Sequence, residues 1–334
     1  MRFGRILGAL GAALALDVTL ALGGVGTAAH AQAQAQNFPN KPIRLVVPSV
    51  AGGILDTVAR TIATKMSEEF GQQVIVDNRP GAGGVIGSDL VAKAPADGYT
   101  LVKLATSHAI NPSIYSRLPY DTLRDFAPVT QTVNLNNLLV AHPSVPANTL
   151  RELIALAKAR PRTITFGSAG NGQSNHLSGE LLKSMAGIEI THVPYKGSAA
   201  ALTDVVAGNV SMMFVDILSA LPHVKAGRLK VIAATGLTRP QAAAEVPTLH
   251  ESGLPGFNGN SWLGLAAPAG TPKEVVAKIS STVAKILQSP DVRESFLARG
   301  VEPVGSTPEQ YGAFIEAEIP RWGQAARASG AKVD

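Results

Sequence analysis

The sequence contains no cysteine and few aromatic or charged residues. The missing cysteine excludes disulfides, thiolate metal sites and a cysteine nucleophile. Aromatic residues make up 5% of the chain and charged residues 16%, against 46% hydrophobic residues. The net charge is +5, but Lys and Arg are scattered without runs or interleaved aromatics, so we expect no nucleic-acid partner. The length of 334 residues suits two folded domains with a sizeable core.

Sequence motifs for catalysis and metal binding are also missing. Residues 81–87 differ from the dinucleotide fingerprint because the last glycine comes one position late, and no phosphate-binding P-loop motif occurs. Residues 172–176 miss the nucleophile elbow at its last position, and the seven histidines lack zinc-site spacing. Asp56 and Asp216 are the loose carboxylate pair that an enzyme would use, but their spacing favours no mechanism. We therefore expect no catalytic residue, no metal site and no cofactor.

The N-terminal segment has the pattern of a secretory signal peptide. Arg2 and Arg5 form a positive start, residues 6–27 are rich in Ala, Leu and Gly, and residues 29–31 form an A-x-A cleavage motif. Asp17 inside the apolar stretch is unusual, and a membrane anchor is the alternative interpretation. No later segment has eighteen consecutive apolar residues. We predict a cleaved signal peptide over residues 1–31 and an exported chain.

Three strand–loop–helix units carry glycine-rich loops. The first is a buried strand over residues 43–47, a small-residue loop and a helical pattern up to residue 66. Helix N-termini with free amide groups bind anions, and glycine lets a ligand approach the backbone. The alternative is that such loops only turn the chain. The loop residues that we single out are Ser49, Gly52, Gly53, Ala82, Gly83, Gly84, Ser168 and Asn171, with Asp56 in the first helical turn.

The order of predicted elements indicates two α/β lobes. Ser107 follows a third strand over residues 99–105, at the sheet edge where parallel sheets bind ligands, although a helix cap or turn would also explain it. A separate strand–helix alternation then begins, and an apolar run over residues 261–268 returns to the first sheet. We predict lobe 1 over residues 32–140 and 258–334, and lobe 2 over residues 141–257. Paired crossings of this kind are typical of hinged binding proteins.

Several short motifs follow one another along the chain after the predicted signal peptide. They are I-R-L-V-V-P at 43, A-G-G at 51, D-N-R-P-G-A-G-G at 77, D-G-Y-T-L at 97, I-N-P at 110, L-P-Y-D at 118, S-A-G-N-G at 168, H-V-P-Y-K-G at 192 and P-A-G-T-P at 268. In this order they closely resemble the solute receptors of tripartite tricarboxylate transporters, the Bug family. The resemblance implies a Venus-flytrap fold with a ligand cleft between the lobes. It also implies a periplasmic monomer that binds a small carboxylate and delivers it to integral membrane transporter subunits.

The resemblance also suggests how the ligand is held. Backbone amides and ordered waters, rather than an arginine clamp, would bind the carboxylate. The loops over residues 49–53 and 82–84 would hold it from lobe 1. The residues that would face it from lobe 2 are Ser168, Asn171, Tyr195, Lys196 and Gly197.

The sequence departs from the family pattern at positions near the expected pocket. Ile54 replaces a proline, Val85 replaces an asparagine, and Val215 stands where the family has an acidic residue, with Asp216 one place later. These changes remove polar groups, so we expect a less polar ligand, such as an aromatic or dicarboxylic acid. The alternatives are a ligand-sensing receptor for a membrane signalling protein and a periplasmic enzyme that acts on a carboxylic acid.

Overall fold

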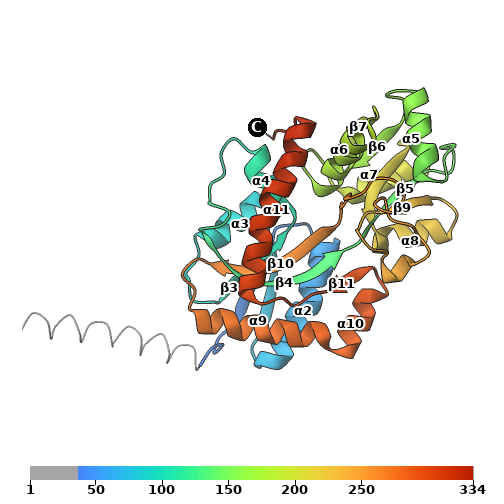
Figure 1. Cartoon of the computed structure of the whole chain (residues 1–334). Helices are drawn as coiled ribbons and strands as arrows, with labels where there is room; N and C mark the ends of the chain where they lie inside the picture. Colours follow the sequence, from blue (N-terminus) through green and yellow to red (C-terminus); the bar gives the residue numbers. More distant parts are fainter. Residues whose placement is uncertain (1–36, 334) are drawn as a thin grey trace, which may run out of the picture.

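The structure, a computed structural model, describes residues 37–333 and has two lobes (Figure 1). The predicted signal peptide and its cleavage site lie outside the described residues. Within residues 37–333, no helix is both long and apolar enough to cross a membrane. The predicted α/β fold with two lobes is confirmed.

The first lobe is built on a mixed sheet with the strand order β11-β4-β10-β3-β1-β2. Its parallel part consists of β1, β2 and β3, and β10 runs antiparallel to both β3 and β4. The strands are β1 (Ile43–Val47), β2 (Val74–Asn78), β3 (Thr100–Ala105), β4 (Phe126–Leu135), β10 (Ser261–Pro268) and β11 (Val301–Pro303).

Helices cover both faces of the first sheet. One face packs against α2 (Ile54–Phe70), α9 (Lys273–Gln288) and α10 (Pro290–Leu297). The other packs against α3 (Val85–Ala92), which follows the short 3-10 helix η1 (Ala82–Gly84), and against α4 (Ser107–Ile114) and α11 (Pro308–Ser329). Because both faces are covered, most side chains of the central strands β1, β3 and β10 are buried and apolar, as expected for a buried sheet.

The second lobe has the strand order β7-β6-β8-β5-β9. Its strands are β5 (Asn137–Ala141), β6 (Thr165–Ser168), β7 (Thr191–Pro194), β8 (Met212–Asp216) and β9 (Lys230–Ala234). Helices α5 (Leu150–Ala159) and α6 (Ser174–Ala186) cover one face, and α7 (Ser198–Ala207) and α8 (Ile217–Lys225) cover the other. The short 3-10 helix η2 (Gln241–Ala243) belongs to the loop that leads back to β10.

The chain passes between the lobes at two adjacent points. The first crossing is at Asn136, because β4 pairs in the first sheet whereas β5 pairs with β8 and β9 in the second. The sequence-based boundary after residue 140 had left β5 in lobe 1. The stretch around Asn136 has no glycine or proline to mark the change of sheet, so we now divide the lobes at this residue. The second crossing comes just before Ser261, where β10 begins.

Side-chain amides join the two crossings to each other. Asn260 Nδ2 donates a hydrogen bond to Asn136 Oδ1 at 2.7 Å, and Asn137 Nδ2 donates to the Gly259 carbonyl at 3.1 Å. Asn260 Oδ1 accepts from Thr235 Oγ1 at 2.8 Å. The segments that connect the lobes are therefore fixed side by side.

The last helix contacts both lobes. Figure 1 shows α11 running along the first lobe and past α4 toward α6 of the second, and these helices are in contact. Tyr311 and Trp322 on its inner face are buried in the core of the first lobe. The carboxylate of the buried Glu318 accepts hydrogen bonds from the indole nitrogens of Trp262 and Trp322, both at 2.8 Å. This helix therefore binds β10 of the first sheet and also packs against the second lobe.

We predict that Gly264→Ala destabilises the first lobe. A Cβ at this position of β10 would lie 2.0 Å from the hydroxyl oxygen of the fully buried Tyr311. Overpacking a rigid ring in a filled core costs roughly 1–3 kcal/mol of unfolding free energy. Urea denaturation measures this loss. In the control Gly312→Ala, the added Cβ lies 3.6 Å from Pro128, an ordinary contact, so equal destabilisation by both variants would contradict the prediction.

Candidate functional site

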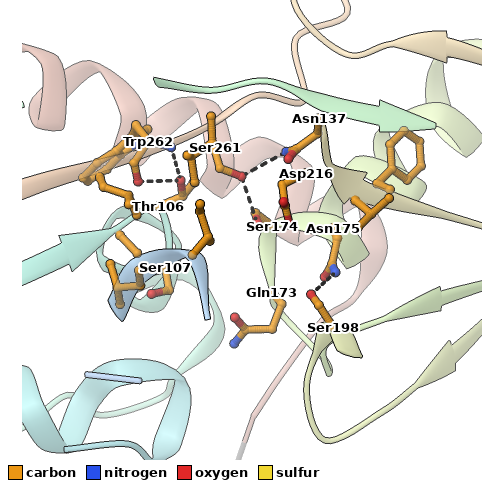
Figure 2. Close-up of a pocket in the computed structure, with 17 residues that line it drawn as sticks. Thr106, Ser107, Asn137, Gln173, Ser174, Asn175, Ser198, Asp216, Ser261 and Trp262 are labelled. Carbon is orange, nitrogen blue, oxygen red and sulfur yellow. Dashed lines mark hydrogen bonds between the residues drawn. The ribbon is translucent and has the colours of Figure 1, made fainter. Parts of the chain in front are cut away.

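A cavity of about 150 Å³ lies between the lobes, next to the two crossings (Figure 2). Both lobes contribute to its walls in similar measure. From lobe 1 come Ile54, Leu55, Ala105, Thr106, Ser107, Leu135, Ser261, Trp262 and Leu263, and from lobe 2 come Asn137, Gln173, Ser174, Asn175, Ser198, Phe214, Val215 and Asp216. A ligand in this cavity would touch both lobes at once.

Helix N-termini converge on this cavity. Ile54, Ser107, Ser174 and Ser198 are the first residues of α2, α4, α6 and α7, and Asp216 is the N-cap of α8. The first amide groups of a helix lack acceptors within the helix, and the helix dipole makes this end positive. No lysine, arginine or histidine of residues 37–333 lines this main cavity. The site therefore offers backbone N–H groups and partial positive charge to an anion.

Some of the polar side chains that line the cavity already form hydrogen bonds with other residues of its wall. Thr106 Oγ1 accepts a hydrogen bond from the Trp262 amide at 2.9 Å. Ser261 Oγ accepts from Asn137 Nδ2 and donates to Ser174 Oγ, both at 3.2 Å (Figure 2). These bonds link β10 and β5 to the start of α6, so they stabilise the wall.

Two polar side chains of the lining are free for a ligand. Among the described residues, neither the Ser107 hydroxyl nor the Gln173 amide makes a side-chain hydrogen bond, and none is drawn to them in Figure 2. Ser107 lies on lobe 1 and Gln173 on lobe 2. A Cβ added to Gly83 of lobe 1 would lie only 3.4 Å from Gln173 Nε2, so the two lobes approach each other closely here.

A small annexe of about 20 Å³ extends the cavity toward the second glycine loop. Gly83, Gly84 and Pro48 form part of its wall, and Asn111 Nδ2 donates to the Gly83 carbonyl at 3.4 Å. Gly84 has φ 93°, and a Cβ there would lie 3.4 Å from Pro48 Cβ, so glycine suits both the backbone and the space. The annexe shares Leu55, Ala105 and Ser107 with the main cavity.

Four of the residues singled out from the sequence line these spaces. Ser107 lines both, Asp216 lines the main cavity, and Gly83 and Gly84 line the annexe. Asp216 also caps α8, because its carboxylate accepts from the Ser219 amide and the Ser219 hydroxyl, both at 2.9 Å. Its negative charge is thus balanced in part by the helix that it caps.

Asp56 anchors the first glycine loop instead of lining the cavity. Its carboxylate accepts hydrogen bonds from the Gly52 amide, Arg60 Nε and Asn78 Nδ2, each at 2.9 Å. Burial acts to raise the pKa of this carboxyl, but the three donors outweigh burial and hold it below the ordinary value. Ser49, Gly52 and Gly53 form the loop that this network holds, and none of them borders the cavity.

The other predicted residues of lobe 2, which are Ser168, Asn171, Tyr195, Lys196 and Gly197, do not line the cavity. Tyr195 donates its hydroxyl to Asp204 at 2.5 Å, which raises the pKa of Tyr195 to about 12 and directs the side chain toward α7. Asn171 and Lys196 are exposed, and Gly197 precedes α7 with φ 118°. In lobe 1, Ala82 of η1 is likewise exposed.

Two histidines hold the third glycine loop. Ser168 is fully buried, its hydroxyl lies 2.6 Å from His192 Nε2, and it accepts from the Gly170 amide at 3.1 Å. His176 Nδ1 accepts from the Gly172 amide at 3.0 Å, and the two imidazole rings stack at 3.9 Å. Burial lowers the pKa of His176 to about 3 and that of His192 to about 4, so both rings are neutral at physiological pH. The Ser168 hydroxyl is therefore bonded within the protein and holds this loop in place, and Ser168 does not line the cavity.

Several lining residues were missed by the sequence analysis. Gln173 directly follows Gly172, Ser198 directly follows Gly197, and Ser174 is the first residue of α6, so the residues that open each helix after a glycine loop were the available signal. Asn137 lies at the first crossing, which sequence periodicity does not reveal, and Ser261 opens the predicted returning strand but was not considered as a lining residue.

We predict that Asp56→Asn destabilises the protein by about 1–3 kcal/mol near neutral pH, because a buried, charge-assisted hydrogen-bond network is lost. The folded-state pKa is lowered, so the stabilisation is complete above the unfolded pKa of about 3.9 and is lost as pH falls through the folded value. Urea unfolding at several pH values should show the variant and the parent converging below about pH 4. A difference that stays constant down to pH 2 would contradict this. Glu68→Gln, at an exposed position of the same helix, is the control.

Comparison with known proteins gives consistent matches. Residues 58–330 match the family described as tripartite tricarboxylate transporter family receptor. Protein BugT of Bordetella pertussis is 37% identical over 305 residues, which cover 91% of this chain and 94% of BugT. A Pseudomonas sp. (strain P51) protein from the tcbD-tcbE intergenic region is 42% identical over 286 residues, 85% of each chain.

Solved structures agree with the sequence relatives. An R. palustris protein solved with adipate has a TM-score of 0.83 and 39% identity, and the match covers 89% of this chain and all of that one. MatC from Rhodopseudomonas palustris with bound malate has a TM-score of 0.78 and 32% identity, and covers 86% and 99% of the two chains. The family predicted from the motifs is therefore confirmed, and this chain belongs to the tripartite tricarboxylate transporter receptor family.

Proposed function

We propose that this protein is a periplasmic receptor for a small dicarboxylate or aromatic acid of low polarity, which it delivers to the membrane subunits of a tripartite tricarboxylate transporter. The observation that carries this proposal is the convergence of helix N-termini from both lobes on a cavity without cationic lining. Such an arrangement binds an anion through backbone N–H groups. The family and the relatives solved with adipate and malate support a carboxylate.

The apolar part of the lining favours a ligand with a hydrocarbon or aromatic middle. Leu55 and Leu263 face the cavity from lobe 1, and Phe214 from lobe 2. Ile54 and Val215, two of the departures from the family pattern, also line it. These side chains give hydroxyl or amino groups no hydrogen-bond partners, so a strongly hydrated solute would lose binding energy on entry.

The contacts with the ligand follow from the lining. We assign direct contacts to Ser107, Asp216, Gly83 and Gly84, and we add Gln173 from the structure. The remaining predicted residues would act through the loops that they form. Because the ligand touches both lobes, it binds the closed form more tightly than the open form and shifts the population toward closure.

We predict that adipate raises the melting temperature of the mature protein. Adipate is the probe because its two carboxylates flank an apolar chain. A thermal-shift panel should show larger shifts for adipate and for aromatic acids than for citrate or glutamate. Stabilisation by citrate or glutamate alone would contradict the proposed ligand class. Conversion of the bound acid to a product, followed by mass spectrometry, would contradict a receptor and favour an enzyme.

We also predict that Ser107→Ala weakens adipate binding about tenfold, because a hydrogen bond to a charged group is lost without another partner taking over. Isothermal titration calorimetry measures the change in Kd. The matched control is Ser281→Ala on α9, an exposed serine that does not line the cavity. Unchanged binding by Ser107→Ala would remove Ser107 from the site.

A further inference from the structure

A lysine is buried in the core of the first lobe without a carboxylate partner. Lys103 of β3 has a relative exposure of 0%. Its ammonium donates a hydrogen bond to Thr132 Oγ1, and no ion pair links it to an acidic residue within residues 37–333. Fully buried lysines are rare unless they are paired, because removing the charge from water is costly. Burial accordingly lowers the pKa of Lys103 well below its ordinary value.

The fold itself does not require this charge. Leu101 and Ala105, on the same side of β3 as Lys103, pack in the apolar core with Leu55 and Leu263. A hydrophobic side chain of similar length would fill the position without the cost of desolvation, and such replacements of buried charges are often stabilising. A role other than stability is therefore needed to explain Lys103.

The position of Lys103 is directly beneath the cavity wall. Ala105 lines the cavity two residues further along the same strand face, roughly 7 Å from Lys103 along the backbone. Lys103 itself borders the annexe next to the second glycine loop. The opposite neighbour on β10 is Leu265, two residues from Leu263 of the cavity wall.

A β-bulge in β4 provides the acceptor for Lys103. Leu263 pairs with Val133 and Gly264 with Gln131, so Thr132 is the extra residue without a partner on β10. Its hydroxyl donates to the Leu263 carbonyl at 2.9 Å, which leaves the oxygen free to accept from Lys103. The ammonium is thus connected through Thr132 to a residue of the cavity wall.

We propose that Lys103 is a specificity-determining residue, whose buried ammonium supplies from beneath the wall the positive charge that the cavity lining lacks. It would act on the ligand through its electric field, which is strong at short range in a poorly screened interior. An anion in the cavity favours the charged lysine, and the charged lysine favours the anion to the same extent. This inference rests on the proposed function and identifies how that site prefers anions to neutral solutes.

Other charged groups near this core are already paired or lie at the surface. On α2, the Asp56 carboxylate is occupied by Gly52, Arg60 and Asn78. On α9, the charged residues are exposed, and on β1 Arg44 pairs with Asp77 of β2. Strands β4 and β10 carry no charged residue. Asp216 lies in the cavity lining itself and is capped by Ser219. A ligand carboxylate would therefore be the nearest anion that is free to complement Lys103.

The test compares the affinities for adipate and for its neutral diamide, adipamide, in Lys103→Met and in the parent protein. Calorimetry should give an adipate Kd at least about tenfold weaker in the variant, with the adipamide Kd unchanged. Thermal unfolding without ligand should show an unchanged or higher melting temperature. A structural role would weaken both ligands alike and lower the melting temperature, so that result would overturn the proposal.

Lys103→Gln is the second variant, because its amide can still donate to Thr132 while the charge is removed. We expect the same selective loss of adipate binding, and adipate binding at parental strength in either variant would overturn the role of Lys103. If the parent protein binds no carboxylate at all, the proposed function is overturned, and this inference is overturned with it.

Discussion

The hydrogen-bonded pairing of the two crossing segments is the constraint on which the rest of the structure depends. Asn136, Asn137 and Asn260 use their side-chain amides to hold the segments together where the chain leaves one sheet and enters the other. The same strands continue into the cavity wall through Leu135 and Ser261. The segments that connect the lobes are therefore continuous with the cavity wall. A ligand bound here would contact both lobes. It would therefore favour the arrangement of the lobes in which their helix N-termini lie close together.

The electrostatics of the site come mainly from the backbone. Five helices begin at or beside the cavity, so the partial charges of their first turns add up without placing a cationic side chain in contact with the solute. Glycine loops serve this arrangement indirectly. Asp56 holds the loop before α2, and His176 holds the loop before α6. The starts of these two helices are therefore held by buried polar groups that do not line the cavity. This separation explains why residues next to the cavity in sequence can be essential for its shape while their side chains point elsewhere.

Much of the architecture was predictable from the sequence, and much of the site was not. Apolar runs beside glycine loops predict β1 and β3 close to their observed bounds and place α2 correctly, because strand and helix periodicity are local properties. The change of sheet at Asn136 depends on long-range pairing and has no local signal. Likewise, the loop containing Tyr195 was expected at the cleft, but the direction of its side chain is set by Asp204, nine residues away on α7. Lys103 looked like an ordinary strand residue, since its burial depends on how other elements pack around β3, which is a long-range property of the fold.

Charged groups lie on different sides of the cavity and would favour one orientation of a bound dicarboxylate. Lys103 and the second glycine loop are on the lobe 1 side, and Asp216 is on the lobe 2 side. One carboxylate would therefore be favoured near the annexe, while the other would lie away from the carboxylate of Asp216. The apolar residues between these ends, with Ile54 and Val215 among them, match a hydrocarbon spacer better than a chain of hydroxyl groups. Both lobes would present helix N-termini to the anion, but Lys103 would add positive charge on the lobe 1 side and Asp216 negative charge on the lobe 2 side.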